Sequence, residues 1–256
     1  MLFLPRIALA KDVVCFTTSV HGGVSKGNYK SFNLGAHVGD NQKRVAINRQ
    51  LLTAILTQQI ANRNDANNLT GSPELKPINW LNQTHSTNIC DYDSILDGTY
   101  DGIETVSKNT PLAVMSADCL PIVIACGESG KIAAVHAGWR GLVGNFLAKV
   151  IACFEYPEAL NVWLGPHISA ANFEVSDAIV ECFKPYSNAI MPQKQKGKYL
   201  VDLSEIALNQ LASLGVMNVQ VSPICTYANE DCFSHRRITH LGQLQTGRMA
   251  TVVVRV

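Results

Sequence analysis

Apolar and polar residues along this chain follow two different periods, which predict a mixture of helices and strands. Between residues 41 and 60, Val45, Leu52 and Leu56 recur at helical spacing, so a helix with one apolar face is predicted there. Similar patterns predict helices over residues 142–154, 176–183 and 205–214. The last helix follows Asp202-Leu203-Ser204-Glu205, a capping-box sequence in which the Asp202 carboxylate accepts hydrogen bonds at the helix start.

Short apolar runs bounded by Asp, Pro and Gly predict strands. These runs occupy residues 12–18, 78–81, 112–115, 122–125, 131–135, 161–164, 219–222 and 249–256. Gly127-Glu128-Ser129-Gly130 predicts a hairpin between two of them. Because hairpins occur beside alternating strands and helices, the pattern predicts an α+β fold with mixed β-sheets and helices on their faces.

One segment interrupts this pattern. Residues 61–77 are rich in Asn, Asp, Gly and Pro and are predicted to form an exposed loop. The segment lacks the length and composition of a linker between domains. We therefore expect residues 1–256 to form a single domain.

Composition narrows the class of protein. The chain has 256 residues, of which 47% are apolar and 16% charged, and its formal net charge is +1. Such a balanced charge provides no long-range field to attract nucleic acid or an anionic membrane, so a small-molecule substrate is expected. No apolar run approaches the roughly 18 residues of a membrane span. The first residues do not form a signal sequence, and the eight cysteines show no disulfide spacing, so a cytoplasmic location is predicted.

Three separated segments each contain one soft metal donor. They are Gln83-Thr84-His85-Ser86, Ala117-Asp118-Cys119-Leu120-Pro121 and His136-Ala137-Gly138-Trp139-Arg140-Gly141. Two imidazoles and one thiolate would leave a fourth coordination position open, as in a catalytic zinc site. If the segments converge, His85, Cys119 and His136 are the predicted metal ligands.

The predicted strands favour this convergence. Pro121 interrupts the ladder near Cys119, and His136 ends the following strand, so both side chains are expected at one edge of the sheet. His85 follows the predicted strand at 78–81 and is expected at the same edge. Asp118 is a candidate hydrogen-bond partner for a ligand. Cys119, His136 and Asp118 are the candidate catalytic residues.

Each of these residues also has an ordinary structural explanation. His85 alone would be a surface residue, Cys119 a buried thiol and His136 a histidine at a helix end. The separations, 34 and 17 residues, are not a metal-binding signature by themselves. From spacing alone, both interpretations stay open.

Anion-binding candidates surround the donors. Gly138 and Gly141 leave backbone amides at a helix start free to face a phosphate, and Arg140 is either a bidentate anion partner or part of a structural salt bridge. The glycine-rich segment Gly22-Gly23-Val24-Ser25 is a second phosphate-loop candidate. It lacks the strand–GxxxxGK–helix context of a nucleotide loop, so a plain turn is favoured.

Taken together, several motifs strongly resemble the YfiH family, whose members are also called laccase-domain proteins, polyphenol oxidases or peptidoglycan editing factors. The resemblance rests on residues 136–141 and 117–121, on Gly22-Gly23-Val24-Ser25 with Ser31-Phe32-Asn33-Leu34-Gly35 and His37-Val38-Gly39-Asp40, and on Phe233-Ser234-His235-Arg236-Arg237 with Thr246-Gly247-Arg248. It implies one α+β domain of layered β-sheets flanked by helices. It also implies a zinc ion bound by His85, Cys119 and His136.

The chain departs from the family pattern at two places. Gln83-Thr84-His85-Ser86 replaces the usual Gln-Val-His-Gly, with the histidine retained. Arg236-Arg237-Ile238-Thr239 replaces the usual Arg-Arg-Asp-Gly, which would alter a rim of the substrate pocket.

The resemblance implies purine nucleoside chemistry: phosphorolysis of adenosine, inosine and methylthioadenosine, and deamination of adenosine. Asn33, Arg49 and Arg140 are the candidates for holding phosphate or ribose. A monomer or weak homodimer is expected.

Three alternatives remain at this point. A His₂Cys set also suits copper, as in a polyphenol oxidase, although the seven histidines include no His-x-His pair of the kind a multicopper oxidase uses. Cys119 with His136 as base would suit an amidase or a hydrolase that edits cell-wall precursors. A structural zinc in a binding module is the non-enzymatic alternative.

Overall fold

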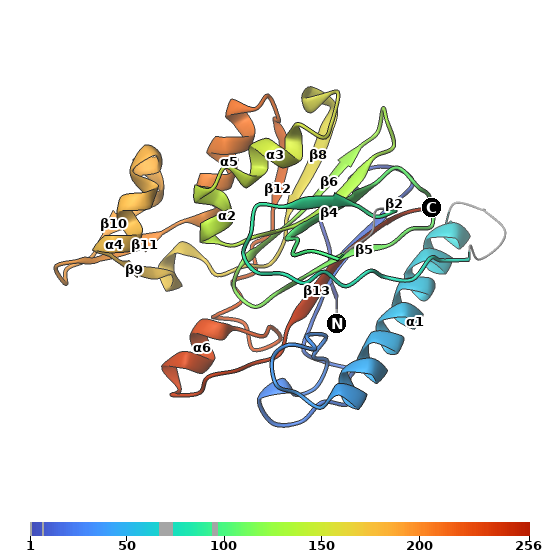
Figure 1. The fold of residues 1–256 in the computed structure, drawn as a ribbon, viewed down its shortest axis with the longest axis horizontal. Coiled ribbons are helices and arrows are strands. Elements are labelled where there is room, and N and C mark those ends of the chain that lie inside the picture. The colour runs from blue at the N-terminus through green and yellow to red at the C-terminus, as the bar shows by residue number, and fades with distance from the viewer. Residues whose placement is uncertain (1, 7, 67–73, 94–96) are drawn as a thin grey trace.

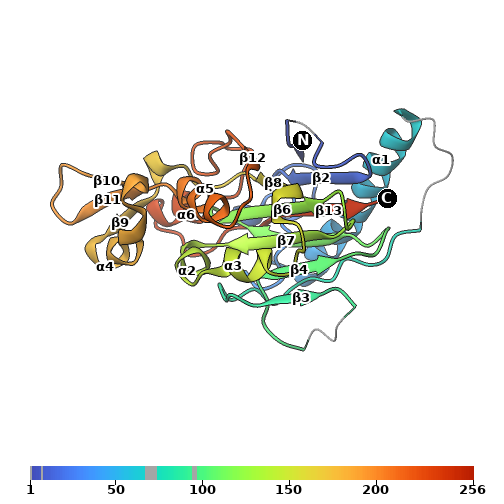
Figure 2. The same ribbon diagram turned by 90° about the horizontal axis from the view of Figure 1, so that it is seen from above.

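Two β-sheets pack face to face, and helices cover the outer face of each (Figure 1, Figure 2). The structure is a computed structural model that describes residues 2–6, 8–66, 74–93 and 97–256. The four-stranded sheet has the order β1 (Leu2–Phe3), β2 (Val13–Thr18), β13 (Met249–Arg255), β5 (Leu112–Ser116). The six-stranded sheet has the order β12 (Asn218–Val221), β8 (Leu160–Leu164), β6 (Leu120–Cys126), β7 (Ile132–Ala137), β4 (Gly102–Thr105), β3 (Ile89–Asp91).

The two sheets differ in how their strands pair. The pairs of the four-stranded sheet are antiparallel. In the six-stranded sheet, β12 pairs parallel with β8 and β3 parallel with β4, whereas the inner pairs are antiparallel. This mixed sheet, with helices on its outer face, confirms the predicted α+β fold.

The space between the sheets is filled by the inner residues of both. Val114 and Val253 from the four-stranded sheet pack in one cluster with Val123, Ile132 and Trp163 from the six-stranded sheet. Trp163 is 1% exposed and is among the largest fully buried side chains. Alternating side chains of β2, β13 and β5 point to the opposite face, so that sheet is buried on both sides.

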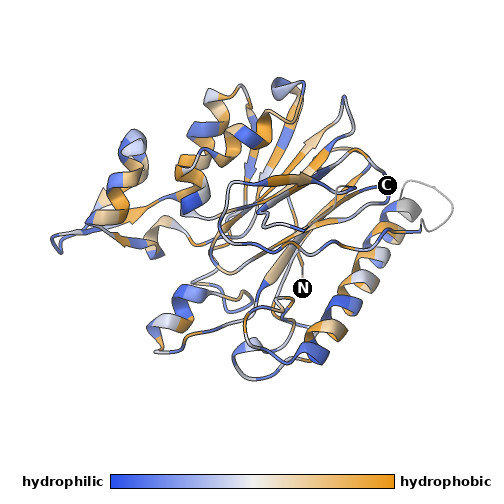
Figure 3. Cartoon of the chain, viewed as in Figure 1, coloured by the Kyte–Doolittle hydropathy of each residue, from blue (hydrophilic) through white to orange (hydrophobic). Residues whose placement is uncertain are grey.

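The outer faces are covered by different helices. Leu52 and Leu56 of α1 (Gln42–Ala66) pack on Phe16 and Val252 of the four-stranded sheet. Helices α2 (Trp139–Val143), α3 (Phe146–Ile151) and α5 (Leu203–Ser213) pack on the six-stranded sheet. Figure 3 shows the apolar residues concentrated along the strands and the helix faces that contact them. No helix among the described residues is long and apolar enough to cross a membrane.

A small third sheet extends the molecule at one end (Figure 2). Its order is β10 (Ile190–Pro192), β11 (Lys198–Val201), β9 (Glu174–Ser176). Next to it lie α4 (Asp177–Val180) and a 3₁₀ segment (Glu181–Ala189). Other short elements are α6 (His235–His240) and 3₁₀ turns at Gly27–Tyr29, Pro157–Ala159 and Ala170–Asn172.

Several local predictions are confirmed. The turn at residues 127–130 joins β6 to β7 as a hairpin. The Asp202 carboxylate accepts hydrogen bonds from the backbone N–H groups of Ser204 and Glu205, at 2.9 and 3.0 Å, and caps α5.

Other boundaries were predicted wrongly. Residues 78–81 form no strand. The side chains of Ile78 and Trp80 instead pack against the apolar cluster that contains Leu52 and Leu56 of α1. The helix predicted over 142–154 begins at Trp139 and is broken in two, because Asn145 adopts a left-handed conformation with φ of 56°. Residues 61–66, predicted as loop, continue α1, and residues 67–73 of that loop lie outside the described residues.

Candidate metal centre and its cavity

The β6–β7 hairpin brings Cys119 and His136 to the same edge of the six-stranded sheet. In the ladder Pro121 pairs with His136 and Leu120 with Ala137, so Cys119 lies beside Gly138. A Cβ atom at Gly138 would lie 3.1 Å from Cys119 Sγ and 2.9 Å from His85 Cδ2. Glycine at this position therefore leaves room for the thiol and the second imidazole to meet.

The turn that precedes Cys119 is fastened through Asp118. This residue has φ of 91° and connects β5 of one large sheet to β6 of the other. Its carboxylate accepts hydrogen bonds from Thr226 Oγ1 and from the backbone N–H of Arg236, both at 2.6 Å. The Asp118 carboxylate therefore anchors the turn to Thr226 and to the start of α6, and its hydrogen bonds among the described residues do not include His85, Cys119 or His136.

A buried carboxylate that the sequence did not indicate, Asp101, holds the other two donors. It accepts hydrogen bonds from the backbone N–H groups of Thr84, His85 and Ser86, at 3.2, 3.1 and 2.6 Å. His136 Nδ1 lies 2.7 Å from Asp101 Oδ1. Asp101 directly precedes the short strand β4, which the sequence patterns did not predict, so nothing in the sequence marked this residue.

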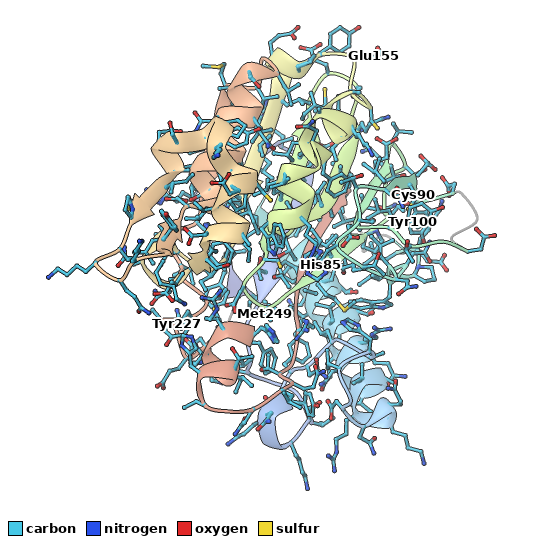
Figure 4. The ribbon with its side chains drawn as sticks, turned by 60° about the vertical axis from the view of Figure 1, so that its left-hand side comes forward. His85, Cys90, Tyr100, Glu155, Tyr227 and Met249 are labelled. Carbon is cyan, nitrogen blue, oxygen red and sulfur yellow. The ribbon has the colours of Figure 1, made fainter. Side chains whose placement is uncertain are left out.

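The three predicted donors converge. The donor atoms of His85, Cys119 and His136 all lie within 4.8 Å of one another. Cys119 Sγ is 3.7 Å from His85 Nε2, which compares with roughly 3.5 Å between S and N atoms in a tetrahedral zinc site. The two imidazole rings meet edge to face, with centroids 4.9 Å apart. Figure 4 shows His85 near the middle of the molecule, between α6 and the helices on the six-stranded sheet. Two imidazoles and a thiol at these distances fit a single metal ion.

Electrostatics at the centre favour a thiolate. Burial raises the pKa of Cys119, but the charge of His136 and hydrogen bonds from His136 and His85 outweigh burial and lower that pKa to about 6. Burial lowers the pKa of His136, whereas Cys119 and Asp101 raise it, with a net result of about 9. The deprotonated sulfur is the form that binds metals or acts as a nucleophile.

A cavity of about 390 Å³ opens next to these donors. One part of its wall is apolar and includes Met115, Trp139, Ile168, Phe173 and Leu203. The volume lies within the roughly 300–1,000 Å³ typical of small-molecule sites.

The rest of the cavity wall is rich in positive or protonatable groups. Arg140, Arg236 and Arg248 line it together with His37 and His235, and the lining contains one carboxylate, Asp118. In the described part of the chain, the hydrogen bonds of the Arg248 guanidinium run from Nη1 to the carbonyls of residues 246 and 247. The remaining N–H groups of Arg248 are available to an anion.

Of the predicted phosphate or ribose ligands, only Arg140 lines the cavity. Asn33 is fully buried and uses its amide on Gly35, Asp40 and the Arg248 backbone. Arg49 donates to the Leu34 carbonyl and stacks on a tryptophan. The positions of Asn33 and Arg49 give no support to the predicted role, although Asn33 accepts a hydrogen bond from the Arg248 backbone directly before β13.

The glycine-rich segment at residues 22–25 is a structural turn. Val24 N–H donates to Asn48 Oδ1 at 2.9 Å, and Ser25 N–H donates to the Ser31 carbonyl at 2.8 Å. A Cβ atom at Gly23 would lie 2.3 Å from the Ser31 oxygen, so this close backbone approach requires glycine. The N–H groups of Val24 and Ser25 donate to acceptors within the protein and are not free to bind phosphate. This favours a plain turn over a phosphate loop.

Comparison with known proteins identifies the family. Residues 14–256 match the family model described as multi-copper polyphenol oxidoreductase laccase. A purine nucleoside phosphorylase of Haemophilus influenzae is 37% identical over 97% of each chain. The purine nucleoside phosphorylase YfiH of Escherichia coli strain K12 is 36% identical over 98% of each chain. The chain therefore belongs to the YfiH family of laccase-domain proteins.

Solved structures agree with this assignment. A crystal structure of a Neisseria meningitidis protein of family DUF152 is similar with a TM-score of 0.84 and 35% identity, covering 99% of this chain and 98% of that one. YlmD from Geobacillus stearothermophilus is similar with a TM-score of 0.81 and 30% identity, covering 95% and 92%.

Proposed function

We propose that this protein is a zinc-dependent purine nucleoside enzyme that carries out phosphorolysis of adenosine, inosine and methylthioadenosine and hydrolytic deamination of adenosine. One observation supports it above all: the His85, Cys119 and His136 donors converge beside a cavity with an apolar wall and a cationic wall. The names of the Haemophilus influenzae and Escherichia coli relatives support the substrate class.

In this proposal His85, Cys119 and His136 hold the zinc ion. A zinc ion bound there supplies Lewis-acid activation of water or of a substrate group. The Trp139 and Phe173 side of the cavity packs against the purine, because flat apolar groups bury well against aromatic rings. Arg140 and Arg248 orient the phosphate, since phosphorolysis depends mostly on positioning and electrostatic stabilisation.

Incubation with adenosine, with and without phosphate, tests the proposal. Adenine that forms only when phosphate is present would demonstrate phosphorolysis, whereas inosine that forms without phosphate would demonstrate deamination. Hypoxanthine formed from inosine and phosphate would demonstrate phosphorolysis of inosine. Liquid chromatography separates adenosine, adenine, inosine and hypoxanthine. Absence of turnover of adenosine, inosine and methylthioadenosine by zinc-loaded protein would contradict the proposal.

Replacing Arg248 with methionine should weaken phosphate binding selectively. A hydrogen bond to a charged group contributes roughly 1.5–3 kcal/mol, so the KM for phosphate is expected to rise by about 10–100-fold. The KM for inosine should change much less. Lys184→Met is the control, because Lys184 is 70% exposed and does not line the cavity. An equal rise of both KM values in Arg248→Met would contradict this assignment of the cationic wall.

A second candidate function uses Cys119 as a nucleophile without metal. The Asp101 carboxylate accepts a hydrogen bond from the His136 ring, and His136 in turn lowers the pKa of the Cys119 thiol. A thiol, a base and a group that orients the base are the parts that a nucleophilic hydrolase requires. This candidate predicts amidase activity that survives chelation and is lost when Cys119 is alkylated. The zinc proposal predicts that chelation alone abolishes activity and that added zinc restores it.

The family description raises copper oxidase activity as a further alternative. Across the described ranges, one group of three or more His, Cys, Asp or Glu side chains is close enough to bind a metal. That group suits a single ion, whereas a multicopper oxidase requires several metal sites. Metal analysis of protein purified without added copper separates the two: stoichiometric copper with phenol oxidation would favour the oxidase.

A further inference from the structure

Asp101 touches both histidines of the candidate metal centre, although they come from distant parts of the chain. Its Oδ1 atom lies 2.7 Å from His136 Nδ1 and 3.1 Å from the backbone nitrogen of His85. Its Oδ2 atom receives the N–H groups of Thr84 and Ser86. The side chain is fully buried. Four donors thus converge on one carboxylate.

The backbone fixes the position of this carboxylate. Asp101 directly precedes β4, whose Gly102 pairs with Val135 of β7. The Asp101 carbonyl also accepts a hydrogen bond of 2.7 Å from the backbone N–H of His136. Main chain and side chain of Asp101 therefore both hold His136, which restricts the position and the rotation of its ring.

The contacts also fix which ring nitrogen of His136 faces the cluster. The ionised carboxylate accepts hydrogen bonds only, so His136 Nδ1 must carry a proton and donate it. In the neutral ring, which is the form that binds a metal, the lone pair is then on Nε2, the remaining ring nitrogen.

The turn that carries His85 depends on the same carboxylate. His85 has φ of 60°, a left-handed conformation that is uncommon for a residue with a side chain. Three consecutive N–H groups of this turn, from Thr84 to Ser86, donate to Asp101. Without these acceptors the turn would lose the contacts that stabilise this conformation.

We propose that Asp101 is the positioning residue of the metal centre: it fixes the tautomer and orientation of His136 and holds the His85 turn within reach of the same ion. This inference rests on the proposed zinc site but not on the nucleoside chemistry. Hydrogen-bond partners of metal-binding histidines typically contribute about 10–100-fold to metal affinity. Because Asp101 supports two donors, its loss is expected at the upper end of that range.

The native protein provides the first test. In zinc-loaded protein with ¹⁵N-labelled histidine, NMR should show His136 with its proton on Nδ1 and the metal on Nε2. Metal on Nδ1 of His136 would overturn the proposal. This measurement needs no substitution at Asp101, so it decides the matter even if the variant fails to fold.

The second test is Asp101→Asn, which replaces one accepting oxygen with an amino group while keeping size. Zinc affinity, measured by competition with a chromogenic chelator, should fall by about 10–100-fold. With Co²⁺ as a spectroscopic probe, the thiolate-to-metal charge-transfer band should persist while the d–d bands shift, because the ligand geometry changes. Both readouts are independent of catalysis.

Asp40→Asn is the matched control. Asp40 is also buried and accepts three hydrogen bonds, from Ser25 Oγ, Asn33 Nδ2 and the Asn41 backbone, but it touches none of the metal donors. It should keep wild-type zinc affinity and the wild-type cobalt spectrum. Wild-type affinity and spectrum in Asp101→Asn would overturn the proposal, as would equal losses in both variants.

The outcomes also separate this proposal from the proposed function. A wild-type protein that binds no zinc overturns both. A protein that binds zinc through an Asp101-dependent centre but converts no nucleoside leaves the positioning role standing and contradicts the function.

Discussion

Replacing Cys119 with serine should remove zinc and activity together while the protein stays folded. Cys119 is partly exposed at the cavity and not part of a packed core, so an isosteric hydroxyl costs little folding free energy. A neutral hydroxyl is a far weaker zinc ligand than a thiolate. Since loss of a partner behind a ligand already costs about 10–100-fold, loss of the ligand itself should lower zinc affinity by more than about 100-fold.

The measurements are zinc content, nucleoside turnover and thermal unfolding of the same samples. Cys182→Ser is the control, because Cys182 is an exposed free thiol distant in sequence from all three donors. It should retain zinc and full turnover. Retention of zinc and turnover by Cys119→Ser would contradict the assignment. Unfolding of Cys119→Ser would favour a structural metal over a catalytic one.

Features set by neighbouring residues could be predicted from the sequence. The Gly-rich turn between β6 and β7 and the Asp202 cap of α5 each depend on a few consecutive residues. The edge position of Cys119 and His136 followed from the proline and glycine signals around them. These signals are local, and the structure reproduces them.

Features set by contacts between distant segments could not be predicted. Asp101 acquires its role only because β4 pairs with β7 and because the His85 turn folds over it. Asp118 looked like a ligand partner because it precedes Cys119, but its carboxylate points to Thr226 and the start of α6. In both cases adjacency in sequence was a poor guide to adjacency in space.

The same limit explains the errors in secondary structure. Ile78 and Trp80 lie in the segment predicted as a strand, yet they pack against the cluster that contains Leu52 and Leu56 of α1 and pair with no strand among the described residues. The segment after His136 was predicted as one helix, yet the left-handed conformation of Asn145 divides it into α2 and α3, which both pack on the six-stranded sheet. Tertiary packing decided both outcomes.

The candidate site also depends on how the two large sheets are stacked. The Asp118 turn passes from β5 in one sheet to β6 in the other, so the position of Cys119 depends on the packing between them. Trp163 fills that space and belongs to the same cluster as Val114 and Val253 of the opposite sheet. The sheet-to-sheet core is therefore a second place where one substitution should have a large effect.

Replacing Trp163 with alanine should lower the free energy of unfolding by about 3–5 kcal/mol, because a large side chain that is 1% exposed leaves a cavity between two sheets. Urea denaturation of metal-free protein measures this loss without added stabilisation from bound zinc. Tyr156→Ala is the control: Tyr156 is 45% exposed, and its loss should cost less than about 0.5 kcal/mol. A loss below about 1 kcal/mol for Trp163→Ala would mean that the two sheets move together and fill the space left by the indole. The packing between the sheets would then not depend on this residue.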